Sequence, residues 1–202
     1  DTEVILHAWE EWGEDSISMW RGMFAIALFD EYKNEITFIR DRAGVKPFNY
    51  YWKDDLLLFS SELKSITQHP LFEKKINPDA VASFLQYGYI SHPHTIYQNT
   101  YKLPPGHLLR LNLETKEIEV TGYWNVYDYY NKPKLDINLT EAISETEKVL
   151  STSFQYRMVA DVPVGVFLSG GYDSTCVTAL LQKESSKRLK TFTIGTTDEK
   201  LN

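Results

Sequence analysis

The sequence predicts an α+β part followed by the beginning of an α/β part. Up to residue 124, pairs of apolar runs around short polar turns predict antiparallel hairpins flanked by helices, the pattern of an α+β layer. Beyond residue 138 the order becomes helix, strand, helix, strand. This order predicts a parallel strand pair joined by a right-handed crossover.

The first elements follow from apolar periodicity. Residues 2–12 have helical spacing, and Gly13 is a plausible C-cap. The side chains expected on one helix face are Val4, Ile5, Ala8, Trp9 and Trp12. "MFAIALFD" and "EITFIRD" around "EYKN" predict one hairpin, and "NYYWKDDLLLFSS" predicts a second that turns at Lys53 to Asp55.

The middle of the chain continues this pattern. "SELKSITQHP" predicts a short helix that Pro70 stops. "NPDAVASFLQYGY" predicts a helix with Asn77 as N-cap, Pro78 at the first helical position and Asp79 at the positive end of the dipole. "LPPGHLLRLNLETKEIEVTGYW" predicts a further hairpin, and the polar, Tyr-rich residues 125–138 are the best candidate for a linker.

The second part begins with a long amphipathic helix, "LTEAISETEKVLSTSFQYRM", for which Thr140 is the expected N-cap. "VPVGVFL" is apolar at both parities and predicts a strand buried on both faces of a parallel sheet. "DSTCVTALLQKESSK" predicts the crossover helix, and "LKTFTIGT" predicts the second strand.

Composition narrows the classes of partner. The chain has 202 residues, 21 basic and 28 acidic, and a net charge of -7. Because no polybasic run exists, nucleic acid and anionic membrane are poor candidates for partners. The longest apolar stretches, "FAIALF" and "VGVFL", are too short to span a bilayer.

The single cysteine, Cys176, excludes an intrachain disulfide and fits a reducing compartment. No signal peptide is visible in "DTEVILHAWEEWG". The chain lacks an initiator Met and ends on "TTDEKLN" directly after a predicted strand. We therefore expect a segment of a longer protein.

The glycine turn "LSGGYDS" at residues 168–174 is the strongest chemical motif. Glycines let the backbone approach a ligand closely, and N–H groups at a helix start favour an anion. Asp173 makes sense as a helix cap or beside Mg²⁺ held by phosphates. The Walker A and G-x-G-x-x-G patterns are absent. A plain strand-to-helix connection remains the alternative, and we favour the ligand site.

A family resemblance extends this interpretation. "SGGYDS" resembles the S-G-G-x-D-S signature of the PP-loop ATP pyrophosphatases. "SFQYRMVADVPVGVFLSGGYDSTCVTALL" resembles the start of the synthetase domain of glutamine-hydrolysing asparagine synthetases. The segments "GMFAIALFD", "FIRDRAGVKPFNYY", "LLFSSELKSI" and "LPPGHLLRL" resemble successive segments of the N-terminal glutaminase of the same family.

The resemblance implies a domain organisation. Residues 1–124 would be the C-terminal portion of a class II glutaminase, an incomplete αββα sandwich of the Ntn-hydrolase kind. Residues 125–138 would be the linker, and residues 139–202 the N-terminal portion of the ATP-pyrophosphatase domain. The family's nucleophilic Cys would lie upstream, so no catalytic residue is expected here. We expect Cys176 to be a small buried residue instead.

The resemblance also assigns binding residues. Asp1 in "DTEV" would bind the α-amino group of glutamine. The pyrophosphate loop for ATP would consist of Ser169, Gly170, Gly171, Asp173 and Ser174. Leu168 and Ile194 would contact the adenosine, and Asp173 would contact Mg²⁺ bound to pyrophosphate. Tyr172 replaces the commoner Leu at the variable position, where we expect no consequence.

The implied activity is that of a ligase. ATP-dependent amidation would convert aspartate to asparagine with ammonia from glutamine, giving AMP, pyrophosphate and glutamate. A related enzyme that amidates another carboxylate, such as a sugar acid, is the alternative, as is a catalytically inert fragment. A β-lactam synthetase is disfavoured because "DTEV" looks intact. We expect a cytoplasmic enzyme, with a homodimer as one possible assembly.

Three other motifs point to structure rather than chemistry. "RDRAG" (40–44) and "SSELK" (60–64) are interpreted as salt-bridged turns in the glutaminase part. His92 and His94 in "HPH" have no carboxylate nearby, so loop decoration is favoured over a metal site.

Overall fold

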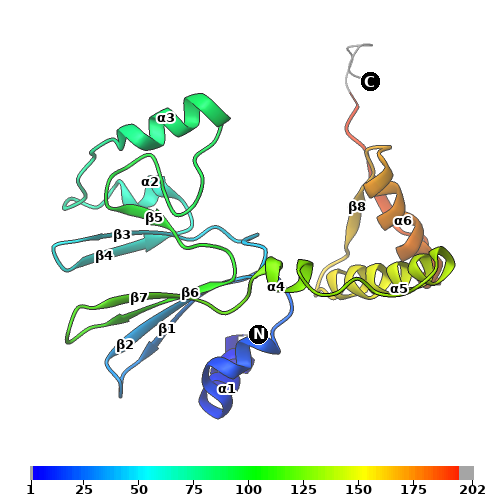
Figure 1. Ribbon diagram of the computed structural model, residues 1–202, viewed down its shortest axis with the longest axis horizontal. Helices are drawn as coiled ribbons and strands as arrows, with labels where there is room; N and C mark the ends of the chain where they lie inside the picture. Colours follow the sequence, from blue (N-terminus) through cyan, green and yellow to red (C-terminus); the bar gives the residue numbers. More distant parts are fainter. Residues whose placement is uncertain (1, 196–202) are drawn as a thin grey trace. The chain divides into compact units, whose positions relative to one another are not determined.

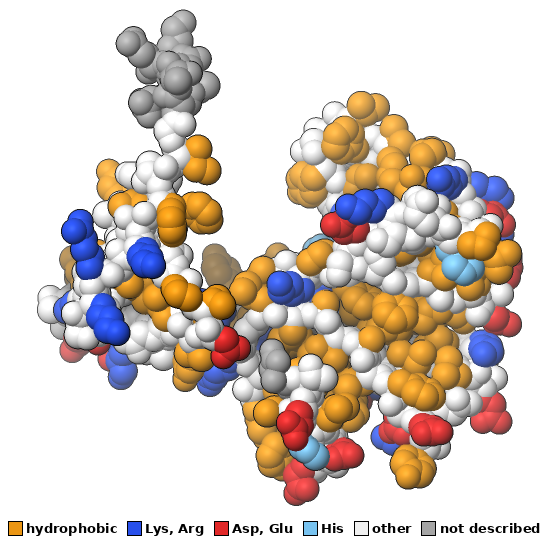
Figure 2. All heavy atoms as spheres, turned by 180° about the vertical axis from the view of Figure 1, so that it is seen from behind, with side chains coloured by type: hydrophobic (Ala, Val, Ile, Leu, Met, Phe, Trp, Pro, Cys, Tyr) orange, Lys and Arg blue, Asp and Glu red, His pale blue; other side chains and the backbone are white. Residues whose placement is uncertain are grey.

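The computed structural model describes residues 2–195. The chain divides into two compact units, one ending at Lys132 and the other beginning at Pro133. Each unit is described by itself. No helix in the described part is long and apolar enough to cross a membrane. On the face seen in Figure 2, both basic and acidic side chains lie on the surface of each unit.

The first unit stacks two antiparallel sheets between helices (Figure 1). One sheet has the order β1-β2-β6-β7, with strands Ala25–Asp30, Glu35–Arg40, His107–Asn112 and Ile118–Gly122. The other has the order β4-β3-β5, with strands Leu56–Ser60, Asn49–Lys53 and Thr100–Lys102. Helix α1 (Thr2–Trp12) and the 3-10 helix η1 (Gly13–Ser18) cover the first sheet. Helices α2 (Leu63–Ile66) and α3 (Pro78–Tyr87) lie on the side of the second (Figure 1).

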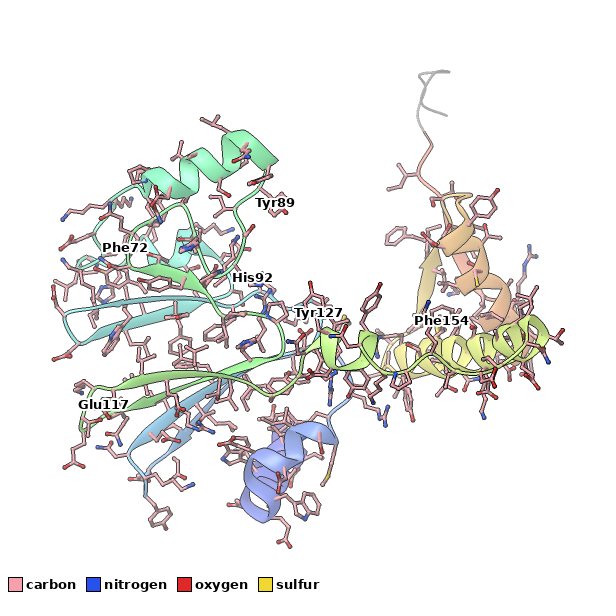
Figure 3. All side chains as sticks on the ribbon, viewed as in Figure 1. Phe72, Tyr89, His92, Glu117, Tyr127 and Phe154 are labelled. Atoms are coloured by element: carbon pink, nitrogen blue, oxygen red, sulfur yellow. The ribbon has the colours of Figure 1, made fainter. Side chains whose placement is uncertain are left out.

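Strand alternation builds three apolar cores in this unit. Phe38 of β2 packs between the sheets, whereas its neighbour Ile39 packs toward α1 and η1. In β3, Tyr50 lies in the core between the sheets, and Tyr51 packs on the other face against Phe72 (Figure 3). Because each sheet is covered on both faces, successive residues of one strand are both buried. The mixed α and β character with antiparallel sheets that the sequence predicts is confirmed.

The local signals in the first unit are confirmed where they concern turns and caps. β1 pairs with β2, β3 with β4, and β6 with β7, all antiparallel. The β3–β4 turn places Asp54 and Asp55 at positive φ. Asn77 caps α3 by accepting hydrogen bonds from the N–H groups of Asp79 and Ala80 at 3.1 and 3.4 Å. Gly88 ends this helix in the left-handed conformation.

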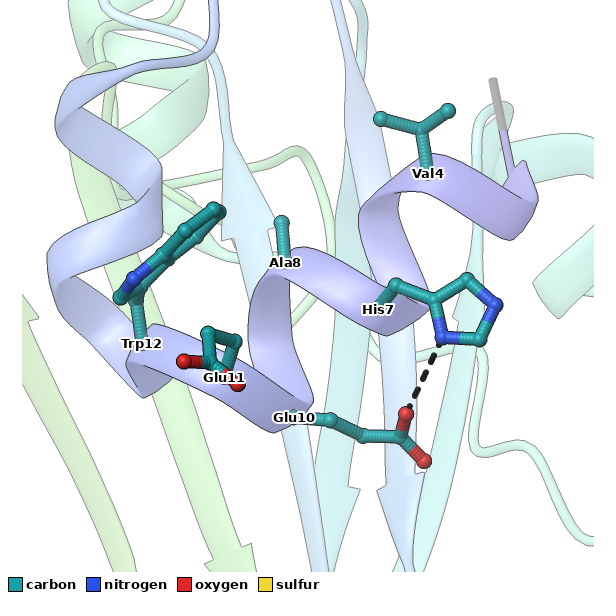
Figure 4. A pocket seen from close by; sticks show the side chains of 6 residues that line it. All are labelled: Val4, His7, Ala8, Glu10, Glu11 and Trp12. Atoms are coloured by element: carbon teal, nitrogen blue, oxygen red, sulfur yellow. Dashed lines mark hydrogen bonds and ion pairs between the residues drawn. The ribbon is translucent and has the colours of Figure 1, made fainter.

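Helix α1 forms as predicted, but its buried face is narrower. Ile5 and Trp9 pack on the core, whereas Val4 is 69 % exposed and Trp12 is 51 % exposed. Val4 points away because one helical step rotates a side chain by about 100° from Ile5. Val4 and Trp12 instead line a shallow pocket on the outer surface of α1 (Figure 4).

Two short elements differ from the expectation. The three residues of strand β5 contain no apolar run from which a strand could be predicted. The strand forms because residues 100–102 pair with the free edge of β3. Helix α4 (Val126–Tyr130) lies in the segment 125–138 that the sequence suggested as a linker. Asn125 caps α4 by accepting a hydrogen bond from the N–H of Tyr127 at 3.0 Å. A five-residue helix has too little periodicity to be recognised in advance.

The expectation of a salt-bridged turn at residues 40–44 is wrong. Asp41 is only 1 % exposed, and its carboxylate accepts hydrogen bonds from the N–H groups of Val45 and Lys46, each at 2.9 Å. Arg40 donates to the carbonyl oxygens of Gly44, Lys46 and Leu103. Backbone groups replace the side-chain partners because strand ends leave carbonyl and N–H groups unpaired.

Side chains next to Arg40 and Asp41 extend this set of hydrogen bonds between strand ends, which we call the joint. Arg42 donates to the carbonyl oxygens of Ile17, Ser18 and Trp20, which ties η1 to the end of β2. The hydroxyl of Tyr123 donates to the Arg40 carbonyl oxygen at 2.5 Å. Burial raises the pKa of Tyr123 to about 12, so this hydroxyl keeps its proton and remains a donor at neutral pH.

The expectation of a salt bridge at residues 60–64 is confirmed. Lys64 and Glu62 form an exposed ion pair at 2.5 Å. Ser60 closes the turn by donating to the Glu62 carbonyl oxygen at 2.6 Å.

The second unit contains helix α5 (Leu139–Arg157), strand β8 (Gly165–Phe167), helix α6 (Tyr172–Glu184) and strand β9 (Lys190–Phe192). β8 and β9 pair in parallel, as the sequence predicts. The expected burial of β8 on both faces is wrong, because only Val166 is half-buried and β9 is exposed throughout. Two helices and two short strands provide too little structure to cover both faces.

The start of α5 also differs from the prediction. Asn138, not Thr140, is the N-cap, and it forms a capping box with Glu141. Asn138 accepts from the N–H of Glu141 at 3.0 Å, and Glu141 accepts from the N–H of Asn138 at 3.0 Å. The reciprocal pair satisfies two N–H groups, which a Thr140 cap inside the helix could not do.

Replacing Asp41 tests the joint. Asp41→Ala leaves the N–H groups of Val45 and Lys46 without their acceptors, so the free energy of unfolding of the first unit should fall by about 2–4 kcal/mol. This free energy is measured by urea unfolding, monitored through the near-UV circular dichroism of the aromatic core. Asp15→Ala, at an exposed carboxylate without a hydrogen bond in the described part, should change it by under ~0.5 kcal/mol. Equal losses in both variants would contradict the role of Asp41.

Candidate phosphate-binding loop

The glycine turn connects the carboxyl end of β8 to the start of α6. Phe167 of β8 lies opposite Phe192 of β9, so the residues after each strand emerge at the same edge of the sheet. The Leu168 N–H donates to the Phe192 carbonyl oxygen at 2.8 Å and continues the ladder by one bond. The turn therefore begins where ligands collect in open parallel sheets.

Glycine is required at the first of the two positions. Gly170 has φ +81°, a left-handed conformation that other residues adopt only with strain. Apart from its two chain neighbours, no atom of residues 2–195 lies within 4 Å of the position that a Cβ would take, so the constraint is the backbone itself. Gly171 is the N-cap of α6 with φ -74°, which any residue can adopt.

Two serine hydroxyls fasten the turn to α6. Ser174 Oγ accepts a hydrogen bond from the Ser169 N–H at 3.3 Å and lies 3.1 Å from Ser169 Oγ. Ser174 Oγ also donates to the Gly171 carbonyl oxygen at 3.2 Å. Since that bond uses the Ser174 proton, Ser169 is the donor between the two hydroxyls. The pair holds both ends of the Gly-Gly turn together.

The backbone N–H groups of residues 170–174 have no hydrogen-bond acceptor within residues 2–195. The first helical bond of α6 runs from the Thr175 N–H to the Gly171 carbonyl oxygen at 3.1 Å. The preceding N–H groups, those of residues 170–174, donate to no acceptor in the described part. Successive unpaired N–H groups at the positive end of a helix are an arrangement that binds anions.

Asp173 lies in the first turn of α6 and is exposed. It does not cap the helix, because α6 has no side-chain capping hydrogen bond. Its carboxylate has no hydrogen bond or ion pair within the described residues, although an acid here is favoured by the helix dipole. The carboxylate is therefore available to a cation or to bound water. No group of three or more metal-ligating side chains occurs among the described residues.

Leu168 and Ile194 follow the two strands at the same edge. The Leu168 N–H and carbonyl oxygen are both engaged, the latter by Thr193 Oγ1 at 2.7 Å. The half-buried side chain of Leu168 and the second lone pair of its carbonyl oxygen are left for a ligand. Ile194 is 88 % exposed, so its side chain is not a core residue of the described part.

The expectation that Cys176 is a buried residue is wrong. It lies on α6 and is exposed, not buried. Together with side chains of α5 and α6 it lines a shallow apolar groove, whose other residues are Leu139, Ala142, Ile143, Thr146, Glu147, Leu150 and Leu180. The apolar lining explains why a small thiol suits the position.

The other predicted residues do not join this site. Asp1 lies outside the described residues. His92 lies in the loop after α3 (Figure 3), and His94 forms a bridge with Tyr101. In the pocket on α1, His7 and Glu10 interact through Nδ1 and Oε2 atoms that are 3.2 Å apart (Figure 4). Both side chains are largely exposed, so this pair is a solvated surface interaction.

In the comparison with known proteins, each of the two compact units matches a different family. Residues 1–124 match the family described as "Glutamine amidotransferase domain". The chain belongs to this family. Residues 145–202 match a second family, described as "Asparagine synthase". The resemblance to glutamine-hydrolysing asparagine synthetases is thus confirmed.

Curated relatives carry the corresponding names. A putative asparagine synthetase [glutamine-hydrolyzing] 2 of Methanocaldococcus jannaschii is 42 % identical over 96 % of this chain and 38 % of its own length. Asparagine synthetase [glutamine-hydrolyzing] 3 of Bacillus subtilis is 33 % identical over 96 % of this chain and 31 % of its own length. The chain thus spans less than two fifths of these relatives.

Among solved structures, the glutamine phosphoribosylpyrophosphate amidotransferase of B. subtilis, complexed with ADP and GMP, is similar at 17 % identity. The alignment covers 96 % of this chain and 38 % of that chain, with a TM-score of 0.38. This score is too low to define a shared fold.

Sequence reasoning did not single out Thr193. Its hydroxyl, directly after β9, donates to the carbonyl oxygen of Leu168, the residue directly after β8. A threonine is ordinary in a strand, and the only available signal was its position directly before Ile194.

The two glycines make a matched pair for mutation. Gly170→Ala forces an alanine to φ +81° and should lower the free energy of unfolding by about 1–2 kcal/mol. Gly171→Ala places a Cβ 3.6 Å from Ser169 Oγ, an ordinary contact, and should lower it by under ~0.5 kcal/mol. Urea unfolding of the full-length protein measures both. If Gly171→Ala were the more costly change, the assigned turn geometry would be wrong.

Proposed function

We propose that ATP is bound, with its pyrophosphate portion on the turn, in a protein that amidates aspartate to asparagine. The binding residues would be Leu168, Ser169, Gly170, Gly171, Asp173, Ser174 and Ile194. The observation that carries the proposal is the run of unpaired N–H groups at residues 170–174. A triphosphate supplies the anionic oxygens that such groups bind. The match of residues 145–202 to the asparagine synthase family supports the same assignment.

The turn would hold phosphate without a cationic side chain. Residues 168–174 contain no Lys or Arg, so the turn would hold phosphate through backbone N–H groups and the hydroxyls of Ser169 and Ser174, with no side-chain cation. The backbone N–H groups among these donors are fixed in place by the fold and do not have to reorganise when charge develops on a leaving group. The turn would therefore stabilise pyrophosphate as it separates from the adenylate.

The residues fit a magnesium ion at the edge of this turn. The Asp173 carboxylate is exposed and has no partner in the described part, and carboxylate oxygens are preferred ligands of Mg²⁺. Asp173 would hold the ion directly or through water. When bound, the ion would neutralise charge on the phosphate oxygens.

We further propose that residues 1–124 are part of a class II glutaminase of the Ntn-hydrolase kind, residues 125–138 its linker, and residues 139–202 part of an ATP-pyrophosphatase domain. The amidotransferase family match and the two covered antiparallel sheets support the first assignment. Asp1 would bind the α-amino group of glutamine. The lone cysteine, Cys176, lies in α6, so glutamine hydrolysis is proposed for the whole protein and not for these 202 residues.

The overall reaction would consume aspartate, glutamine, ATP and water. It would yield asparagine, glutamate, AMP and pyrophosphate, the formation of the aspartyl adenylate releasing the pyrophosphate. The relatives' names support aspartate as acceptor. A cytoplasmic enzyme fits the lone cysteine. A homodimer stays a prediction.

Pyrophosphate release by the full-length protein tests the function. With ATP, Mg²⁺, aspartate and glutamine, we expect pyrophosphate and asparagine to form in equal amounts. Omitting aspartate should abolish both products. Release with a sugar acid but not with aspartate would overturn the choice of acceptor and leave the ATP site standing.

Asp173→Ala in the full-length protein tests the metal assignment. The change should lower pyrophosphate release by about a hundredfold or more, while glutamine hydrolysis is retained. Tyr172→Leu is the matched control, because that side chain is 96 % exposed at the variable position of the motif and should leave both rates unchanged. Equal loss of both activities in Asp173→Ala would indicate a folding defect.

A further inference from the structure

We propose that Thr193 is a positioning residue for the phosphate-binding turn. Its hydroxyl donates to the Leu168 carbonyl oxygen at 2.7 Å and joins the end of β9 to the residue from which the turn departs. This inference rests on the proposed ATP site and adds a residue that neither family match assigns. Thr193 acts through Leu168 and not by touching the phosphates.

The hydrogen bond replaces a missing ladder bond. The Leu168 N–H pairs with the Phe192 carbonyl oxygen, so in a continuing parallel ladder the Leu168 carbonyl would accept from the Ile194 N–H. Instead, the side chain of Thr193 supplies the donor. The strand pairing thus ends at Leu168 without leaving its carbonyl oxygen unpaired.

Thr193 and Ser174 hold two consecutive residues at the start of the turn. Ser174 on α6 holds Ser169 through its N–H and hydroxyl. Thr193, after β9, holds Leu168. Gly170 and Gly171 follow directly and have no side chain with which to fix their own position. Loss of the hydrogen bonds to either residue would let the N–H groups of residues 170–174 change direction.

This role matters because the turn has no cationic side chain. A lysine could follow a phosphate as the backbone moves, but a backbone N–H donates only in the direction that the chain sets. The affinity for phosphate therefore depends on how well the turn is held before the ligand arrives.

Thr191 in β9 is a matched control for Thr193, which directly follows that strand. The two threonines are two positions apart, which places them on the same side of extended chain, and both are exposed. The Thr191 hydroxyl makes no hydrogen bond within the described residues, whereas that of Thr193 does. Thr191→Val and Thr193→Val therefore remove the same atoms from one side of the chain, and only the second breaks the bond to Leu168. Thr193→Ser keeps the hydroxyl.

The experiment measures the Kd of Mg-ATP by calorimetry on the full-length protein without aspartate, and then KM and kcat for pyrophosphate release. Thr193→Val should raise the Kd and the KM for ATP about three- to ten-fold, with the KM for aspartate unchanged. Thr193→Ser should restore wild-type values, and Thr191→Val should keep them.

The outcomes separate this inference from the proposed function. Wild-type affinity in Thr193→Val, or equal weakening in Thr191→Val, would overturn the positioning role while the ATP site stands. Failure of Thr193→Ser to restore binding would overturn it as well. If the unmodified full-length protein binds no ATP, the proposed function falls and this inference falls with it.

Discussion

The buried carboxylate of Asp41 is the constraint on which the first unit depends. Its two oxygens fix the N–H groups of Val45 and Lys46, and its own carbonyl oxygen accepts from the N–H groups of Gly44 and Gly106. One residue thus orders the chain that leads into β3 and the chain that leads into β6. These strands belong to different sheets, so the hydrogen bonds of Asp41 relate one sheet to the other.

The apolar core between the two sheets depends on how Asp41 positions one sheet relative to the other. Phe38, Leu109 and Tyr50 meet between the sheets only if β2, β6 and β3 present matching faces. A shift of one residue in either sheet would turn these side chains outward and bring their neighbours in. Arg40 reinforces the alignment, since its guanidinium reaches the carbonyl oxygens of Lys46 and Leu103. Burial lowers the pKa of Arg40, and the energetic cost of that burial is offset by these acceptors.

The sequence predicted features that local chemistry determines, and it failed where the partner lies far along the chain. The hairpins and the Asn77 cap depend on residues within a few positions of each other, so their types and spacing are visible in the printed letters. The charges of "RDRAG" suggested a salt bridge, but the acceptors of Arg40 include Leu103, 63 residues away. Exposure of β8 and Cys176 also depends on what packs against them, which the pattern of apolar letters does not contain.

In the candidate site, too, features determined by local chemistry were predictable and the hydrogen bonds between residues were not. The motif "SGGYDS" predicted which residues form the turn, because glycine and hydroxyl side chains have local roles. It could not predict that the two Ser hydroxyls bond each other, or that the N–H and the carbonyl oxygen of Leu168 each have a partner. Those bonds decide what a phosphate would meet: free N–H groups at the Gly-Gly turn, and hydroxyls that must exchange one partner for another. A phosphate site built from dipoles in this way would depend on how rigidly the backbone is held, so residues that do not touch the ligand, Thr193 first among them, would contribute to its affinity.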